Sequence, residues 1–485
     1  MYTIGIVGFG VVGLAGLKFF IKYPARINKF LGLTADEPVR FVIWDQKEQP
    51  VEHAALFAKH GIEWRLAASC SLPSFFAQVD KALVSPGVSL VSAGDLTGKA
   101  FCELDLFQHC FAGKSIGITG SLGKTTVTKL IYQLLKRERA KLQRAGNVVL
   151  GGNVGIGMLD LLDDAVVAAW AVLELSSFQL ERSHAFAPTV AVWTNLYPNH
   201  LDRHLTIAGY FEAKSLLFKQ QSASAITILG TQLFDENTYD LTIGLLAQLK
   251  SALVVAGAAP LTQQFIDRVP CKAWTAFMVH DGLLGKYGII DGAIVSVQPL
   301  LAVSHLPPCT FGDNWAVIFA ALDAAGSDCA WLVQDLQEHQ ELYNPDDQHH
   351  RLEFVRRAME IDFYNDSKST VKESTLAAAR QLARTYKRVH VIVGGLGKGV
   401  DRSDFVPMLK LVPAVTTIVA FGKEAPALGA ELTVCSLEDA LRKIMAIVLP
   451  GDAVLFSPGG ASFDLFKNYE HRGNCFKELV TGLRA

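Results

Sequence analysis

The sequence predicts an α/β protein of three domains, with Rossmann-like parallel sheets at the two ends of the chain and an α/β domain of the P-loop type between them. Three observations indicate this fold class. The chain has 485 residues, more than one hydrophobic core usually organises. Short apolar runs alternate with helix-length segments, as in parallel sheets with crossover helices. Glycine-rich turns follow several of these runs, where strands pass into helices.

The composition excludes two classes of protein. Hydrophobic residues make up 50% of the chain and charged residues 19%, which indicates a folded and not a disordered protein. A net charge of −2 gives no basic surface field, so we expect no nucleic-acid partner.

Apolar runs, the N-terminal segment and the cysteines indicate where the protein acts. No apolar run reaches the roughly 18 residues that a membrane-spanning helix needs, and DAVVAAWAVLELSS, which comes nearest, is interpreted as a helix end followed by a buried strand. The start MYTIGIVGFG lacks the basic flank of a secretion signal. The eight cysteines are scattered without a CxxC pair, which is typical of reduced thiols. We therefore predict a cytoplasmic protein without a membrane span, and we expect a monomer.

The predicted first domain, residues 1–110, contains the strand-like runs TIGIVGF, RFVIWD and KALVSPG. Its turn Gly8-Phe-Gly10-Val-Val-Gly13 resembles a dinucleotide-binding fingerprint. The acid at the end of the next strand, Asp45, lies beyond the usual spacing of roughly 20 residues. Two interpretations stay open: an NAD or FAD site, or a glycine turn that binds the phosphates of another nucleotide.

The predicted central domain, residues 111–347, begins with the phosphate-loop pattern GITGSLGKTTVTKLI. An apolar strand ends in Gly120 and Gly123, and a helix follows, so the backbone N–H groups of the loop can cradle an anion. Lys124 supplies a cation and Thr125 a hydroxyl for a metal ion. The alternative is a glycine-containing strand-to-helix turn with a chance lysine. We interpret the segment as a phosphate site for ATP or GTP.

Three further polar residues of this domain are candidates for the site. Glu174 ends the run AVLEL, where a carboxylate commonly reaches the Mg²⁺ of a bound nucleotide, although an edge or capping role is the alternative. His200 follows the strand TVAVWTN and should lie on the same sheet edge. Lys214 lies in the helical stretch YFEAKSLLF, where its spacing alone favours a surface lysine. Between residues 221 and 308, short β-like pieces surround the turn signal Asp291-Gly292, and QEHQELYNPDDQHH is interpreted as a linker.

The predicted third domain, residues 348–485, has strands near IDFYND, RVHVIVGG, TTIVAFG and DAVLFSPGG. Three polar turns follow strands of this domain: NDSKST at residues 365–370, GGLGKG at residues 394–399, and SPGGASFDLF with Ser462, Lys467 and Arg472 near it. The carboxyl ends of parallel strands meet at one edge of a sheet, so these turns predict one binding site.

These motifs together resemble the Mur ligases, over nearly the whole chain. The resemblance is carried, in order, by TGSLGKTT, GGNVG, ELSSFQLE, NHLDRH, HRLEFV, NDSKST, GGLGKG and SPGGASFDLFKNYEHRGNCF. NDSK and KNYEHRGN are similar to the members that add D-glutamate. The resemblance implies a UDP-binding domain, a central ATPase domain and a C-terminal domain that brings the amino acid. It also implies that ATP phosphorylates the carboxylate of UDP-N-acetylmuramoyl-L-alanine and that the amine of D-glutamate then attacks.

The resemblance assigns roles by motif. The catalytic residues would be Lys124, Glu174, His200, Lys214 and Lys368. Contacts to ATP would come from Gly120, Ser121, Gly123, Lys124, Thr125, Thr126, Asn314, Arg351 and Asp366. Two Mg²⁺ ions would be held by Thr125, Glu174, His200 and a carbamylated Lys214. The UDP-sugar would contact Val11, Val12, Asp45, Gln46, Gly87, Asn153 and His200, which makes GFGVVG a UDP site. D-Glutamate would contact Thr370, Lys398, Ser462 and Tyr469, the last through its backbone.

The chain also departs from the family pattern, at Leu122, Asp313, Val317, Val371 and the pair Pro198-Asn199. These positions bear on the adenine contacts and on the second metal site. Two other functions remain open: a related amide ligase with a different amino acid, and a nucleotide-binding or NAD-dependent regulatory protein that performs no ligation.

Overall fold

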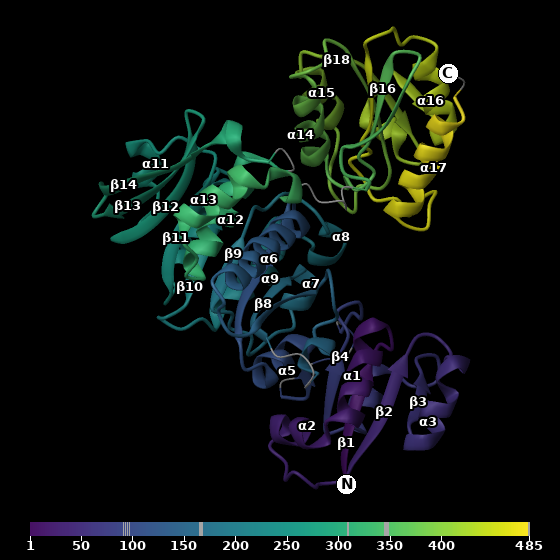
Figure 1. The fold of residues 1–485 in the computed structure, drawn as a ribbon. Coiled ribbons are helices and arrows are strands. Elements are labelled where there is room, and N and C mark those ends of the chain that lie inside the picture. The colour runs from purple at the N-terminus through teal and green to yellow at the C-terminus, as the bar shows by residue number, and fades with distance from the viewer. Residues whose placement is uncertain are drawn as a thin grey trace. The chain divides into compact units, whose positions relative to one another are not determined.

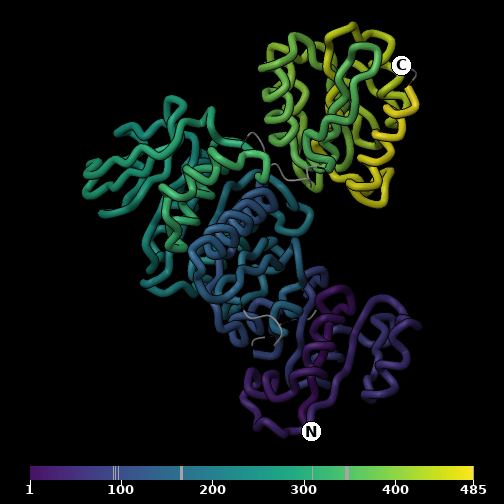
Figure 2. The backbone as a smooth tube through the Cα atoms, viewed as in Figure 1, coloured from purple at the N-terminus to yellow at the C-terminus, as the bar shows by residue number. Residues whose placement is uncertain are grey.

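The computed structural model describes residues 1–90, 92, 94, 96, 98–163, 168–307, 310–343 and 349–483. The chain forms two compact units. The first comprises Met1–Leu196 and Phe211–Tyr343, and the second comprises Tyr197–Tyr210 and Asn344–Ala485. Figure 1 labels the elements and Figure 2 traces the backbone of each unit from purple at the N-terminus to yellow at the C-terminus. The predicted domain boundaries after residues 110 and 347 stay a prediction.

The first sheet is parallel and has the strand order β3-β2-β1-β4-β5. The order reverses at β1, as expected of a doubly wound fold. Its strands are β1 (Tyr2–Val7), β2 (Val39–Asp45), β3 (Glu63–Leu66), β4 (Lys81–Val84) and β5 (Ala100–Phe101). The helices of this part are α1 (Val11–Lys22), α2 (Pro24–Leu31), α3 (Ala54–His60), α4 (Leu72–Ala77) and α5 (Glu103–Cys110). The Rossmann-like sheet predicted here is confirmed.

The second sheet belongs to the same unit and has the order β14-β13-β12-β11-β10-β9-β6-β8-β7. Its parallel strands are β6 (Lys114–Thr119), β7 (Asn147–Gly152), β8 (Ala168–Glu174), β9 (Val190–Trp193), β10 (Ile226–Gly230), β11 (Ala252–Gly257) and β12 (Ala273–His280). The antiparallel strands β13 (Leu283–Ile290) and β14 (Ala293–Ala302) extend it at one edge. The predicted turn between them is confirmed: Asp291 and Gly292 have φ of 47° and 76°, as a type I′ turn requires.

Helices α6 and α12 form the core against this sheet, because both bury apolar residues on its strands. The helices of this part are α6 (Lys124–Lys141), α7 (Ser177–Leu180), α9 (Ile207–Lys219), α10 (Tyr239–Leu246), α11 (Gln263–Asp267), α12 (Gly312–Ala324) and α13 (Cys329–Glu338). Helix α8 (Leu201–His204) and the start of α9 lie in the segment Tyr197–Tyr210, which belongs to the second unit. Val317, one of the departures from the family pattern, is a buried core residue of α12. The predicted linker contains a short 3-10 helix, Gln340–Tyr343, while its residues 344–348 lie outside the described part.

The third sheet has the order β15-β16-β20-β17-β18-β19 and is parallel except for β15. Its strands are β15 (Glu353–Ala358), β16 (Ile361–Asn365), β17 (Val389–Gly394), β18 (Val415–Phe421), β19 (Leu432–Val434) and β20 (Ala453–Phe456). Two apolar clusters fill its two faces. Figure 1 shows α14 (Lys372–Leu382) and α15 (Phe405–Lys410) over one face, and α16 (Leu437–Met445) and α17 (Tyr469–Thr481) over the other.

Three further predictions concern the cysteines, the segment DAVVAAWAVLELSS and membrane spans. The seven cysteines that it describes are free thiols, and Cys309 lies outside the described residues. The helix end predicted at residues 164–167 also lies outside them, whereas the buried strand after it is β8. No helix in the described part of the chain is long and apolar enough to cross a membrane.

Candidate active site

The phosphate loop lies at residues 120–123, between β6 and α6, as the sequence predicts. Its glycines are required by close approaches. A Cβ on Gly120 would lie 2.0 Å from Thr194 Oγ1, and a Cβ on Gly123 would lie 2.8 Å from Asn314 Oδ1. Gly123 has φ of 79°, a left-handed conformation that glycine adopts without strain. The loop therefore leads into the N-terminus of α6, where backbone N–H groups favour a phosphate.

Asn195, which was not predicted as a site residue, fixes the loop. Its side chain accepts a hydrogen bond from Leu122 N at 2.8 Å and donates one to Leu122 O at 3.1 Å. Its own carbonyl accepts from Ser121 N at 3.0 Å. Because these bonds reach the backbone of Leu122, they hold the loop whatever side chain stands there. The position of Asn195, just after a buried strand, was the only sequence signal for this role.

Two lysines converge on the carbonyl oxygen of Gly120. Lys124 Nζ donates to it at 2.9 Å and to Ser121 O at 3.2 Å. Lys214 Nζ donates to it at 3.0 Å and to Thr119 Oγ1 at 3.2 Å. The Lys214 side chain is 1% exposed, so it is not a surface lysine. Burial lowers the pKa of Lys214 well below its usual value, the charge of Lys124 lowers it further, and Glu174 acts in the opposite direction.

Glu174 ends β8 and is buried beside this pair of lysines. Its Oε1 accepts a hydrogen bond from Asn153 Nδ2 at 3.0 Å, while its Oε2 is buried with no hydrogen-bond partner in the part of the chain described. A carboxylate oxygen in that state fits a ligand to a hard cation such as Mg²⁺. No cluster of three or more His, Cys, Asp or Glu side chains among the described residues could hold a metal alone. An ion at Glu174 would therefore need the oxygens of other groups, such as hydroxyls or phosphates.

The remaining candidates of the central segment are distributed over both units. Thr125 and Thr126 follow Lys124 in the first turn of α6. Asn314 lies in α12, and its side-chain amide donates to Thr310 Oγ1 at 2.6 Å. His200 precedes α8 with φ of 56°, and it belongs to the second unit through the segment Tyr197–Tyr210. Its predicted share in a metal site with Lys214 stays a prediction.

The first sheet brings Asp45 to the glycine turn despite its long spacing in sequence. Asp45 Oδ2 accepts a hydrogen bond from Phe9 N at 2.6 Å, and Oδ1 accepts one from Lys47 N at 2.8 Å. Gly13 is required here because a Cβ would lie 2.2 Å from Gly8 O. Of the other residues predicted to contact the UDP-sugar, Val11, Gln46 and Gly87 are exposed and Val12 is partly buried. Asn153, also predicted for the UDP-sugar, directly follows β7 of the second sheet and donates to Glu174; its role stays a prediction.

In the second unit, two buried arginines tie the predicted polar turns together. Arg472 donates to Ser367 Oγ at 3.1 Å, to Ser367 O at 2.7 Å and to Gly460 O at 2.9 Å. Arg402 donates to the carbonyls of Gly394, Gly395 and Gly459, at 3.2, 2.5 and 3.2 Å. The turns after β16, β17 and β20 are therefore brought together as predicted. Arg402 was missed, because no local pattern indicates that its side chain joins the turn after β17 to Gly459 in the turn after β20.

Asp366, in the turn after β16, is buried and accepts hydrogen bonds from Ser457 Oγ at 2.6 Å and from Leu352 N at 3.1 Å. Burial raises its pKa to about 6, against the opposing effects of Ser457 and of the charge on Arg351. Arg351 is thus near Asp366, as the shared role predicted for them requires. Val371, a departure from the family pattern, is buried just before α14.

The residues predicted for D-glutamate lie in the same turns of the second unit. Ser462 is buried, and Thr370 and Lys398 are partly buried. The carbonyl of Tyr469, at the start of α17, accepts a hydrogen bond from Ser367 Oγ at 2.8 Å. Lys368 Nζ lies 5.5 Å from the centroid of the Tyr469 ring. Ammonium and hydroxyl groups of this kind recognise a carboxylate.

Comparison with known proteins places these sites in a family context. Residues 118–260 match the family model described as the Mur ligase middle domain. The chain is 32% identical to a UDP-N-acetylmuramoylalanine–D-glutamate ligase of Acidobacterium capsulatum over 432 residues, 84% of each protein. It is 30% identical to the ligase of the same name from Vibrio atlanticus, over 98% of this chain and 97% of the relative. The MurF ligase of Thermotoga maritima, solved in complex with ADP, shares the fold with a TM-score of 0.52 at 15% identity, over 91% of this chain and 95% of its own.

Proposed function

The chain belongs to the Mur ligase family, and we propose that it is an ATP-dependent ligase that adds D-glutamate to UDP-N-acetylmuramoyl-L-alanine in peptidoglycan precursor synthesis. The observation that carries the proposal is the arrangement at the phosphate loop, where the buried, partner-free oxygen of Glu174 lies near two lysines that donate to Gly120 O. This arrangement suits the transfer of a phosphoryl group. The names of the relatives supply the substrates.

The reaction has two steps. The carboxylate of UDP-N-acetylmuramoyl-L-alanine attacks the γ-phosphorus of ATP, so that an acyl phosphate forms and ADP leaves. The neutral amine of D-glutamate then attacks the acyl carbon, and the tetrahedral intermediate expels phosphate to leave the amide. The first step replaces a poor leaving group by a good one, and its developing negative charge needs cations that are already in place.

Residues of the predicted central domain, 111–347, would serve the phosphoryl transfer. The N–H groups of residues 120–126 bind the triphosphate, and Lys124 exchanges its loop carbonyls for phosphate oxygens. Thr125 and Glu174 would hold one Mg²⁺, and His200 with a carbamylated Lys214 would hold a second. When bound, Mg²⁺ neutralises charge on the phosphates and orients them. The lowered pKa of Lys214 supplies the neutral amine that carbamylation requires.

Residues of the second unit would serve the amino acid and part of the nucleotide. Arg351 and Asp366 would contact ATP, the role that the resemblance assigns to them. The carboxylates of D-glutamate are received by Thr370, Lys398, Ser462 and the backbone of Tyr469, with Lys368 near the transferred phosphoryl group. The turns around Val11, Val12, Asp45, Gln46 and Gly87, together with Asn153, receive the UDP-sugar. The protein would work as a cytoplasmic monomer.

A coupled assay for ADP release tests the proposal. ADP should appear only when ATP, Mg²⁺, UDP-N-acetylmuramoyl-L-alanine and D-glutamate are all present. Lys124→Ala should lower the rate at least about 100-fold, because it removes a cation from the transferring group, whereas Lys136→Ala, an exposed residue on the same helix, should not. ADP release with L-alanine or meso-diaminopimelate and not with D-glutamate would support a different ligase of the family. No release with any of the three, together with tight NAD binding, would contradict ligation.

A further inference from the structure

The backbone around Arg351 adopts an uncommon conformation. His350 and Leu352, which flank it, have φ of 64° and 43°. Residues other than glycine rarely adopt this left-handed region, and each such residue costs free energy that surrounding contacts must offset. The segment 350–352 is therefore held in place by something other than its own preference.

Two carboxylates hold this segment through its backbone. Glu353 Oε2 accepts a hydrogen bond from His350 N at 2.9 Å, and Asp366 Oδ1 accepts one from Leu352 N at 3.1 Å. The two bonds lie on either side of Arg351, one on each left-handed residue. Hydrogen bonds from N–H groups to an ionised carboxylate are stronger than those between neutral groups. The conformation that carries Arg351 thus depends on both acids.

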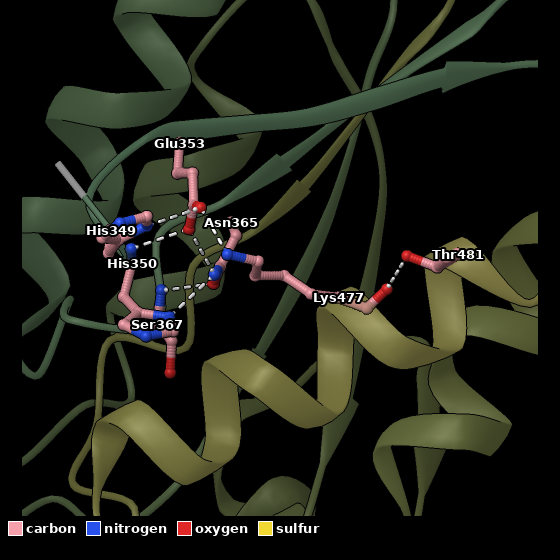
Figure 3. Close-up of polar contacts among 7 residues, drawn as sticks. All are labelled: His349, His350, Glu353, Asn365, Ser367, Lys477 and Thr481. Carbon is pink, nitrogen blue, oxygen red and sulfur yellow. Dashed lines mark hydrogen bonds and ion pairs between the residues drawn. The ribbon is translucent and has the colours of Figure 1, made fainter. Parts of the chain in front are cut away.

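Glu353 is in turn fixed by three side chains, which Figure 3 shows around its carboxylate. Asn365 Nδ2, at the end of β16, donates to Oε2 at 3.0 Å, while Lys477 Nζ, from α17, donates to Oε1 at 2.6 Å. His349 Nδ1 lies 3.1 Å from the same Oε1. Burial acts to raise the pKa of Glu353, but the N–H of His350 and the side chains of Lys477 and His349 outweigh it and lower the pKa to about 2. The carboxylate is therefore ionised at any working pH.

Asn365 extends the network to His350. Its amide nitrogen has two hydrogens, and the second is directed to His350 Nδ1 at 2.9 Å. Burial lowers the pKa of His350, which favours the neutral ring that can accept this bond. Asn365 Oδ1 also accepts from Ser367 N at 3.1 Å, next to Asp366. The buried amide of Asn365 thus links Glu353 to the backbone of the turn that contains Asp366.

We propose that Glu353 is a positioning residue, which keeps the segment 350–352 in the one backbone conformation that presents Arg351 to a bound nucleotide. The inference rests on the nucleotide site of the proposed function. In this role Glu353 acts through the N–H of His350 and not through a contact of its own with the nucleotide. Lys477 and Asn365 anchor it to α17 and β16, so the position of Arg351 is set by the framework of the third sheet and not by its loop alone.

The test is a double-mutant cycle on the full chain, read as the Kd of Mg-ADP by calorimetry. Glu353→Gln should weaken binding about tenfold, which corresponds to the loss of one charged hydrogen bond. On an Arg351→Ala background the same substitution should have no further effect, because its effect passes through Arg351. Glu478→Gln, an exposed glutamate beside Lys477 on α17, is the matched control and should bind as wild type. The KM for D-glutamate should not change in Glu353→Gln.

Other outcomes would contradict either the positioning role of Glu353 or the proposed ligase activity. Wild-type affinity in Glu353→Gln, or effects of Glu353→Gln and Arg351→Ala that multiply, would overturn the positioning role. If Glu353→Gln does not fold, Lys477→Met replaces it in the double-mutant cycle, since it leaves the Glu353 carboxylate but removes the ammonium group that donates to it at 2.6 Å. The effect of Lys477→Met on the Kd must likewise vanish on the Arg351→Ala background. A wild-type protein that binds Mg-ADP and shows this cycle, but releases no ADP with the three substrates, would contradict the proposed ligase and support the positioning role.

Discussion

Lys214 has the most unusual environment of the single residues in the candidate site. Its spacing alone favoured a surface lysine, yet the structure buries it against Gly120 O and Thr119 Oγ1. A buried ammonium beside a second lysine is costly, which is why its pKa is lowered well below the usual 10.5. The neutral amine is the form that reacts with CO₂ to give a carbamate, an anion that a second Mg²⁺ would accept as a ligand.

The carbamate leads to the first prediction. Lys214→Ala should lose at least about 100-fold in kcat, because a metal ligand is missing, and added acetate or formate should restore part of the activity by occupying the vacated position. Lys219→Ala, which replaces an exposed lysine on the same helix, should keep the wild-type kcat with and without the added anion. Rates measured with and without each anion decide the matter. A fully active Lys214→Ala enzyme would end the proposal of a carbamate.

Asp366 gives a prediction for the pH dependence of stability. Its folded-state pKa of about 6 lies above its ordinary 3.8, so between these values the folded protein holds a proton that the unfolded chain has lost. Stability should therefore fall as pH rises through this window, by on the order of 2–3 kcal/mol. Asp366→Asn should remove most of this fall. Thermal midpoints of the nucleotide-free protein at pH 4.5 and 7 measure it, and an unchanged pH dependence in the variant would contradict the assigned pKa.

At the scale of elements, local patterns were enough for the strands and turns that carry chemistry. The phosphate loop, the turn at Asp291-Gly292 and the three polar turns of the third sheet follow from apolar periodicity and glycine placement, which are local properties. Asn195, Arg402 and Glu353 could not be predicted in this way. Their roles depend on partners that the fold brings from elsewhere, such as Gly459 for Arg402 and Lys477 for Glu353. The sequence indicated a turn between β13 and β14, but it did not predict that these strands extend the second sheet, because no local pattern tells which sheet a hairpin joins.

Helix α6, which begins at the phosphate loop, is fixed at its other end by a buried acid. Glu138 accepts hydrogen bonds from Ser327 Oγ at 2.6 Å and from Asp328 N at 2.8 Å, just before α13. Glu138→Ala should leave the buried Ser327 hydroxyl and the partly buried Asp328 N–H without this acceptor, at a cost of about 1–3 kcal/mol in local stability. Hydrogen exchange of the amides of α6 and α13 should quicken accordingly, while Glu338→Ala, exposed on α13, should not change it. Unchanged protection in Glu138→Ala would show that apolar packing alone fixes the helix.

At the scale of the whole molecule, the candidate residues divide between the two units. Lys124, Glu174 and Lys214, predicted for the triphosphate and its metal ions, belong to the first unit. Lys398 and the other residues predicted for D-glutamate belong to the second, which has its own sheet and two apolar clusters. Each unit is therefore expected to carry a separable share of substrate recognition.

This division leads to the last prediction. Lys398→Ala should raise the KM for D-glutamate by about tenfold or more, because an ammonium that pairs with a carboxylate is worth about 1.5–3 kcal/mol, and it should leave the KM for ATP within about twofold. The backbone at Lys398 has φ of 52°, and its carbonyl accepts a hydrogen bond from Asp202 N at 3.2 Å. The thermal midpoint of Lys398→Ala should therefore be compared with that of the wild type, to show that the substitution leaves the fold intact. Lys410→Ala, which removes an exposed lysine of α15, is the control. Initial rates with D-glutamate and ATP varied in turn measure both constants. Equal increases in the two KM values would mean that Lys398 supports the second unit as a whole and does not recognise the amino acid.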